Sequence, residues 1–115
     1  MASTHNKSFH VAEALTDDST SPWQQLIAKE SSFIGFFKAA SVHASTVVSA
    51  KIQHSPDAST WYDLLTFSDL NGVDGDQKMS VNAVEDHVFQ YVRGVIELAG
   101  ATQEATCTLQ LFFDR

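Results

Sequence analysis

The chain has 115 residues, a length that suits one domain with a real core and leaves little room for a second. Hydrophobic residues make up 43% of it, which is ordinary for a globular protein and argues against disorder. Fourteen acidic against seven basic residues give a formal net charge of −7, and the basic residues are scattered from Lys7 to Arg115. Because phosphate neutralisation needs clustered cations, we expect no nucleic-acid partner and no binding to an anionic membrane surface.

We predict an extended N-terminal arm over the polar residues 1–22, with a short strand around Phe9 to Leu15, and a β-sandwich domain over residues 23–115. Such an arm is of the kind that a partner orders. At the start of the domain, Ser21 and Pro22 suit an N-cap and a first helical residue. A short helix from there through Lys29 is one interpretation, and an extended edge over Trp23 to Lys29 is the other.

The stretch from Val48 to Leu64 indicates a strand, a tight polar turn and a second strand. Apolar residues at 48, 50 and 52 alternate with polar ones, which predicts one buried face. Pro56 fixes φ at the start of the turn, and Asp57 and Ser59 can hydrogen-bond to nearby main chain. Further strands are predicted over Phe33 to Ala40, Thr46 to His54, Thr60 to Phe67 and Thr106 to Phe113.

The segment from Val81 to Ala99 is open to two interpretations. Its apolar residues fit a helical spacing of three and four, but valine, tyrosine and phenylalanine favour strands. We predict a loop through Asp86 and a strand from His87 to Leu98. The expected fold is an all-β antiparallel sandwich, jelly-roll-like, with at most one short helix. Its expected core residues are Val48, Ala50, Ile52, Trp61, Leu64, Val92, Leu109 and Leu111.

The sequence contains no recognisable catalytic motif, so we expect no enzyme and no cofactor. Nucleophile-elbow and phosphate-loop patterns are absent from it. Cys107 is the single cysteine, which excludes an intramolecular disulfide and a cysteine-based zinc site. Its alternating neighbours, Thr106 and Thr108, predict an inert core thiol. No apolar run approaches the roughly 20 residues of a membrane span, and no signal core follows Met1, so the chain should be cytosolic where it is made.

Two sets of residues are candidates for metal sites. The loop from Asp69 to Asp76 collects three carboxylates and an amide, but it fails the calcium-binding EF-hand register, so we expect a solvated turn with Gly72 and Gly75 at positive φ. The histidines at 5, 10, 43, 54 and 87 show no helical pair spacing. His43 and His54 could face each other across a hairpin, although surface histidines are the more ordinary interpretation.

The aromatic content is larger than a sandwich of this size easily hides. We therefore expect an interface that contains Phe9, Val11, Trp23, Phe33, Phe36, Phe37 and Arg93. Arg93 lies inside an apolar strand, where an arginine is usually at a strand edge, or stacked and paired with a carboxylate on the sheet face, and we expect such a structural pair. A subunit or carbohydrate contact is the sharper alternative for this residue.

Three segments carry a family resemblance: Ala50 to Trp61, Phe89 to Ile96, and Gly100 to Thr102. Over residues 33–115 the chain resembles the small β-sandwich accessory proteins of tailed-phage virions, which decorate or cement a capsid lattice or sit on tail parts. Discoidin-like and galactose-binding-like sandwiches have a similar hairpin and a similar Tyr-Val-Arg strand. This chain is shorter than a discoidin domain and lacks its paired cysteines.

The resemblance implies a virion structural protein that contacts the major capsid protein or another virion protein. It implies a virion location after assembly in the host cytoplasm. We expect a homo-oligomer, with a trimer favoured, because symmetric assembly multiplies weak contacts. A carbohydrate- or ligand-binding module is the alternative function.

Overall fold

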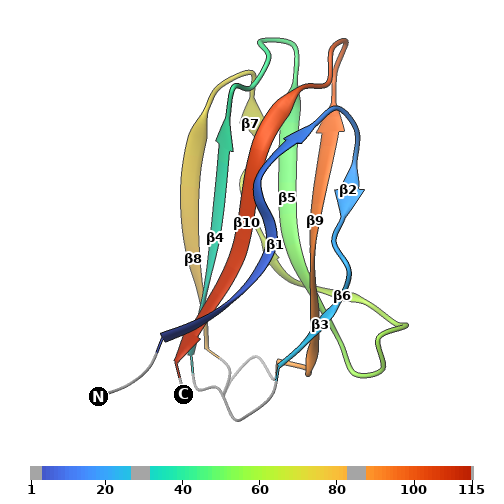
Figure 1. Ribbon diagram of the computed structural model, residues 1–115, viewed down its shortest axis with the longest axis vertical. Coiled ribbons are helices and arrows are strands. Elements are labelled where there is room, and N and C mark those ends of the chain that lie inside the picture. The colour runs from blue at the N-terminus through green and yellow to red at the C-terminus, as the bar shows by residue number, and fades with distance from the viewer. Residues whose placement is uncertain (1–3, 27–31, 83–87, 115) are drawn as a thin grey trace.

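The computed structural model describes residues 4–26, 32–82 and 88–114, which form two antiparallel sheets packed face to face (Figure 1). Sheet A has the order β1-β10-β4-β8, with bounds Thr4–Leu15, Ala105–Asp114, Ser32–Ala40 and Gly75–Asn82. The centre of sheet B consists of β9 (Tyr91–Ala99) and β5 (Val47–Ser55). On β9 lie the short strands β2 (Ser19–Thr20) and β3 (Gln24–Gln25). On β5 lie β6 (Tyr62–Thr66) and β7 (Leu70–Asn71).

The connections between these strands are those of a jelly roll. Strands β2 and β3 occupy one interrupted position beside β9, and β6 and β7 occupy another beside β5. Counted in this way, eight strands alternate between the two sheets except where β5 turns into β6. A two-sheet sandwich of eight antiparallel strands is the jelly-roll architecture. The predicted antiparallel β-sandwich is therefore confirmed, and the described residues contain no helix.

The core forms between the sheets from side chains that alternate along each strand. In β10, Cys107, Leu109 and Leu111 are fully buried, whereas the residues between them are half-exposed. The predicted core residues that are buried are Val48, Ala50, Ile52, Val92, Leu109 and Leu111. Leu64 is only partly buried, because the register between β5 and β6 shifts at this position.

The prediction for Trp61 is wrong. Its side chain is half-buried and lies against the Arg93 guanidinium instead of in the core. Trp61 precedes β6, so the alternation of that strand does not determine its direction.

The segment expected to be an N-terminal arm forms an edge strand of one sheet and a short strand of the other. β1 pairs with β10 from Thr4 opposite Asp114 to Leu15 opposite Ala105, with bulges on either side of His10. It is longer than the strand predicted around Phe9 to Leu15. Phe9 and Leu15 are both buried, so their apolar area is removed from water only when β1 docks on the sandwich.

The described residues 21–26 are extended, so the helical interpretation is wrong for them. The Ser21 hydroxyl accepts a hydrogen bond from the Gly94 N–H at 2.9 Å instead of capping a helix. The Ser21 N–H donates to the Gly94 carbonyl, also at 2.9 Å. These bonds hold the chain on β9, in agreement with the alternative of an extended edge. Residues 27–29 of the predicted helix lie outside the described residues.

Strand β8 was not predicted, because its sequence is polar and only Val81 among its described side chains is buried. The Gln77 amide donates to the Ser68 carbonyl at 2.8 Å and accepts from the Ser68 N–H at 2.9 Å, which ties this edge to sheet B. The described part of the later segment forms β9 from Tyr91, and its helical alternative is wrong. Val81 and Asn82 of the predicted loop belong to β8, and residues 88–90 of the predicted strand are not in a strand, so the prediction is wrong at both places. Residues 83–87, with the rest of the predicted loop and the strand start at His87, lie outside the described residues.

Gly94 lets β9 pack closely against sheet A. A Cβ atom added there would lie 2.6 Å from the Phe9 Cβ and 2.7 Å from the Leu109 Cδ2. We predict that Gly94→Ala lowers the free energy of unfolding by about 1–3 kcal/mol, because it overpacks a filled core. Urea unfolding measures this effect. The exposed substitution Ser68→Ala, which keeps the main-chain bonds to Gln77, is the control and should change stability little. A Gly94→Ala protein as stable as the wild type would contradict this packing.

Two histidines, His10 and His54, are buried, so the expectation of surface histidines is wrong for them. His10 is 2% exposed, its Nε2 lies 3.1 Å from the Ser19 Oγ, and its Nδ1 has no hydrogen-bond partner among the described residues. His54 is 7% exposed, and its Nδ1 accepts from the Phe89 N–H at 3.1 Å. Burial lowers the pKa of His10, although the charge of Glu13 opposes this, and burial also lowers the pKa of His54.

We predict that stability falls as the pH drops through the ordinary histidine pKa of about 6.5 and below it. The unfolded chain then binds protons that the folded chain resists, so acid favours unfolding. Thermal unfolding between pH 7.5 and 5.5 measures the effect. The double variant His10→Gln, His54→Asn, which keeps polar atoms near the bonded nitrogens, should flatten the pH dependence. His43→Asn, at an exposed position, should not. An unchanged slope in the double variant would contradict the prediction.

Candidate interaction surface

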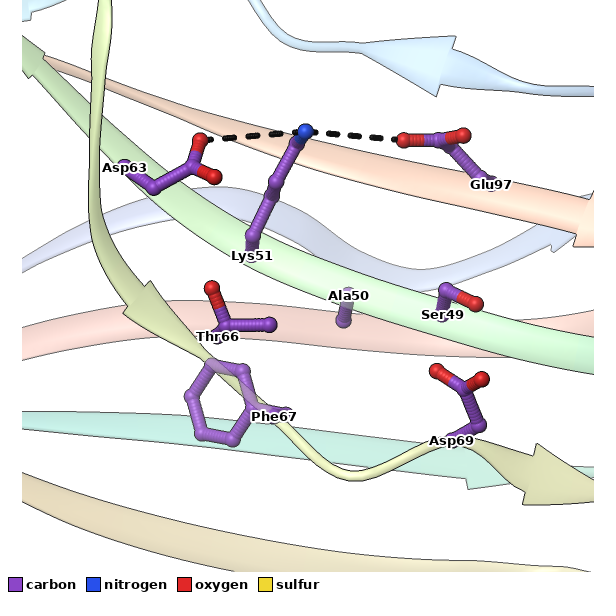
Figure 2. Close-up of a pocket in the computed structure, with 8 residues that line it drawn as sticks. All are labelled: Ser49, Ala50, Lys51, Asp63, Thr66, Phe67, Asp69 and Glu97. Atoms are coloured by element: carbon purple, nitrogen blue, oxygen red, sulfur yellow. Dashed lines mark ion pairs between the residues drawn. The ribbon is translucent and has the colours of Figure 1, made fainter.

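A row of connected side chains crosses the outer face of sheet B. It starts at Trp61 and Arg93, where the Arg93 Nε donates to the Gln53 Oε1 at 2.8 Å. The Gln53 Nε2 then donates to the Asp63 Oδ1 at 3.0 Å. Lys51 continues the row, with its Nζ 3.7 Å from the Asp63 Oδ1 and 3.7 Å from the Glu97 Oε1 (Figure 2). We call these six residues the sheet B row.

Strand pairing places the row on one face. Gln53 lies directly opposite Arg93 on β9 and opposite Asp63 on β6. Because successive side chains of a strand point to opposite faces, the burial of Ile52 and Val92 in the core puts Gln53 and Arg93 outside. The row is therefore the outward half of the same alternation that builds the core.

Arg93 is stacked on the sheet face, but the carboxylate pair expected for it is not seen among the described residues, so that expectation is wrong for them. Its Cζ lies 4.3 Å from the centroid of the Trp61 ring, within the range of a cation–π contact. Part burial lowers the pKa of Arg93, although an arginine keeps its charge at any physiological pH.

At the Lys51 end, the row borders an open pocket of about 220 Å³ (Figure 2). The pocket is lined by Ser49, Ala50, Lys51, Asp63, Thr66, Phe67, Asp69 and Glu97. Its charged lining is three carboxylates and one ammonium group. Two of these carboxylates, Asp63 and Glu97, are already paired with Lys51.

The loop considered for calcium does not gather its carboxylates. Asp69 lines the pocket, whereas the Asp74 Oδ1 accepts the Val42 N–H at 2.9 Å. Gly72 has φ +65°, as predicted, but Gly75 begins β8 and is not at positive φ. In the described part of the chain, no group of three His, Cys, Asp or Glu residues is placed to hold a metal ion.

The histidines are also dispersed. His43 precedes β5 and His54 lies near its end, so the two do not face each other as a cross-strand pair. Each has a local role instead: the His43 Nδ1 accepts from the Ser45 N–H at 3.0 Å, and His54 accepts from Phe89. The side chains of His5 and His87 lie outside the part that the structure describes.

Four aromatic side chains lie at the end of sheet B where β5 ends and β9 begins. Trp23 is 51% exposed and meets Tyr91 edge to face, with their ring centroids 5.0 Å apart. Tyr62 is 52% exposed and lies 6.2 Å from the Phe89 ring, which in turn packs on His54. Exposed aromatic groups are typical of protein interfaces. We call Trp23, Tyr62, Phe89 and Tyr91 the aromatic end.

The structure disperses the residues that the sequence grouped into one interface. Phe9, Phe33 and Phe37 are buried in the core, so that part of the prediction is wrong. Phe36 is half-buried on the outer face of sheet A, and Val11 is 61% exposed on β1. The pairing of Gln24 with Val92 places Trp23 and Arg93 close together at one end of sheet B.

The estimate of surplus aromatic residues failed because β4 turns both Phe33 and Phe37 inward, where the sandwich accommodates them. Tyr62, Phe89 and Tyr91 were missed. The alternation of Tyr91 with Val92 and Arg93 was a signal for one of them, because it puts Tyr91 on the same face as Arg93.

No protein-family model and no curated protein sequence matches this chain. Solved structures of infectious bursal disease virus share its fold. The Gx strain structure has a TM-score of 0.67 at 11% identity, over 98% of this chain and 32% of the other. The structure of the VP2 subviral particle has a TM-score of 0.64 at 14% identity, over 98% of this chain and 32% of the other. The structure of T=1 particles derived from the virus has a TM-score of 0.66 at 11% identity, over 98% of this chain and 31% of the other.

At this identity the likeness shows the fold alone, a β-sandwich of the kind found in virus particles. The chain spans about a third of the length of the solved chains it matches. In the described residues, no helix is long and apolar enough to cross a membrane.

Cys107 is fully buried, and burial together with the charge of Glu13 raises the pKa of its thiol to about 11. We predict that a disulfide reagent labels the native protein roughly 100-fold more slowly than the urea-unfolded chain at pH 8, because little thiolate forms and access is blocked. Thiol release followed by absorbance measures both rates. Fast, stoichiometric labelling of the native protein would mean that Cys107 is a reactive group.

Proposed function

We propose that the chain is a structural protein of a virus particle that decorates or cements a capsid lattice through protein–protein contacts. One observation carries this proposal. Almost the whole chain, 98% of it, matches part of solved chains from infectious bursal disease virus particles, with TM-scores of 0.64 to 0.67. A tailed-phage accessory protein is the finer assignment that we propose, on the sequence resemblance described above.

The chemistry of the surface supports a binding role. We propose that the chain has no catalytic centre and needs no cofactor. The connected side chains on sheet B are a stacked arginine, an amide and ion-paired carboxylates, which bind and orient well but include no activated nucleophile. The aromatic end beside them offers apolar contact area for a partner.

The proposed partners are the major capsid protein or another virion protein, with assembly in the host cytoplasm and a final location in the virion. We also propose that the chain self-associates, with a trimer favoured. A lattice repeats each contact many times, so weak individual contacts suffice for stable decoration.

A carbohydrate-binding module is the second candidate function. Jelly rolls also occur in lectins. The specific observation in its favour is Trp23, an exposed ring that lies beside Tyr91 and near the amides of Gln25 and Gln90, which bond to each other at 3.3 Å. A glycan-binding screen tests it directly.

The experiment for the virion proposal is isolation of virus particles from the natural host on a density gradient, followed by quantitative mass spectrometry. We predict that the chain comigrates with intact particles in a fixed copy ratio. In a reconstitution, Trp23→Ser should weaken association with the particles, because it removes exposed aromatic contact area. The control is Ile34→Ser, at a residue that is 45% exposed on the outer face of sheet A. Absence of the chain from purified particles would contradict the proposal.

A further inference from the structure

The two cations of the sheet B row differ in how their charges are balanced. Lys51 lies between the carboxylates of Asp63 and Glu97, at 3.7 Å from each. Arg93 instead contacts two neutral groups, the Gln53 amide oxygen and the Trp61 ring. In the part of the chain that the structure describes, Arg93 makes no ion pair.

Gln53 fixes the direction of the Arg93 side chain. Its amide nitrogen donates to the Asp63 Oδ1 at 3.0 Å, so its oxygen is turned toward Arg93 and accepts from the Nε at 2.8 Å. The Trp61 ring, 4.3 Å from the Cζ, restrains the plane of the guanidinium group. A guanidinium has five N–H donors, and the bond to Gln53 uses only the one on Nε. The two terminal nitrogens of the guanidinium group can therefore donate to both oxygens of a carboxylate in a bidentate contact.

The surroundings of Arg93 strengthen any such contact. Tyr91 lies on the same face of β9, two residues before Arg93, and Trp23 packs on Tyr91. Arg93 itself is half-buried. A charge pair formed in a partly dehydrated, aromatic setting is stronger than one formed in open water.

We propose that Arg93, stacked on Trp61, is a docking site for an Asp or Glu side chain of a neighbouring protein subunit. The proposal rests on the virion function above and specifies one of its contacts. Charge complementarity argues for this occupant, because the chain carries fourteen acidic residues against seven basic ones, so other copies present many carboxylates. Arginine, tryptophan and tyrosine are also the residues most enriched at the centres of protein interfaces.

The first test uses an acetylated, amidated tetraglutamate peptide as the probe, titrated into the isotope-labelled protein and followed by NMR. We expect saturable shifts at the Arg93 Nε–H and the Trp61 indole N–H, and binding that weakens with salt. Arg93→Gln should bind about tenfold more weakly or worse. Arg93→Lys, which keeps the charge but loses the planar fork, should fall between the two.

The matched control is Lys51→Gln on the same face, which should leave peptide binding within about twofold of the wild type, since Lys51 is already paired. The amide spectrum of each variant reports whether it is folded, and Arg93→Lys keeps the test valid if Arg93→Gln unfolds. The proposal would be overturned if the wild type, Arg93→Lys and Arg93→Gln all bound the tetraglutamate peptide equally well. It would also be overturned if the wild type bound a tetraglutamine peptide as tightly as tetraglutamate. Tighter binding of glucuronate than of the peptide would assign the site to an acidic sugar and also overturn it.

The same variants separate this proposal from the virion function. If wild-type protein and Arg93→Gln associate equally with particles, and both bind the peptide equally, the Arg93 site is rejected while the virion function stands. If the wild type binds the peptide at Arg93 but never associates with particles, the carboxylate site stands and the virion function is rejected.

Discussion

The antiparallel pairing of β5 with β9 is the constraint on which both faces of sheet B depend. It sets Ile52 opposite Gly94 and Gln53 opposite Arg93, and so sends one pair inward and the next outward. In the inward pair, Gly94 lies against Phe9 and Leu109 of sheet A, and only a glycine at this position leaves room for their side chains. The outward pair begins the sheet B row. A slip of one residue would exchange the two faces, burying a charge and exposing the core.

Sequence reasoning succeeded where a strand has one clearly apolar face. Val48, Ala50 and Ile52 in β5, and Leu109 and Leu111 in β10, identified the core because their neighbours are polar. It failed at the edges of sheet A. β8 has little apolar area to bury, and β1 has only a few apolar anchors interrupted by bulges. Such strands form because a neighbouring strand offers hydrogen-bond partners, which a local pattern does not contain.

The candidate surface was predicted in part. Arg93 was recognised as unusual, and Trp23 as exposed, but the partner of Arg93 was not. Trp61 precedes β6 and reaches Arg93 only through the turn that Asp57 organises by accepting the N–H groups of Ser59 and Thr60. These bonds also lower the pKa of Asp57. The contact therefore depends on how a loop folds back across two strands, and neither alternation nor spacing encodes that.

We propose that this jelly roll is built into a virus particle through the outer face of sheet B. An electron cryomicroscopy map of particles that contain the chain tests it most directly. We expect density for the two-sheet sandwich at a repeated lattice position, with Trp23 and Arg93 buried against a neighbouring subunit and a carboxylate at the guanidinium. A map in which the sandwich is absent, or is held by other surfaces while sheet B faces solvent, would contradict it.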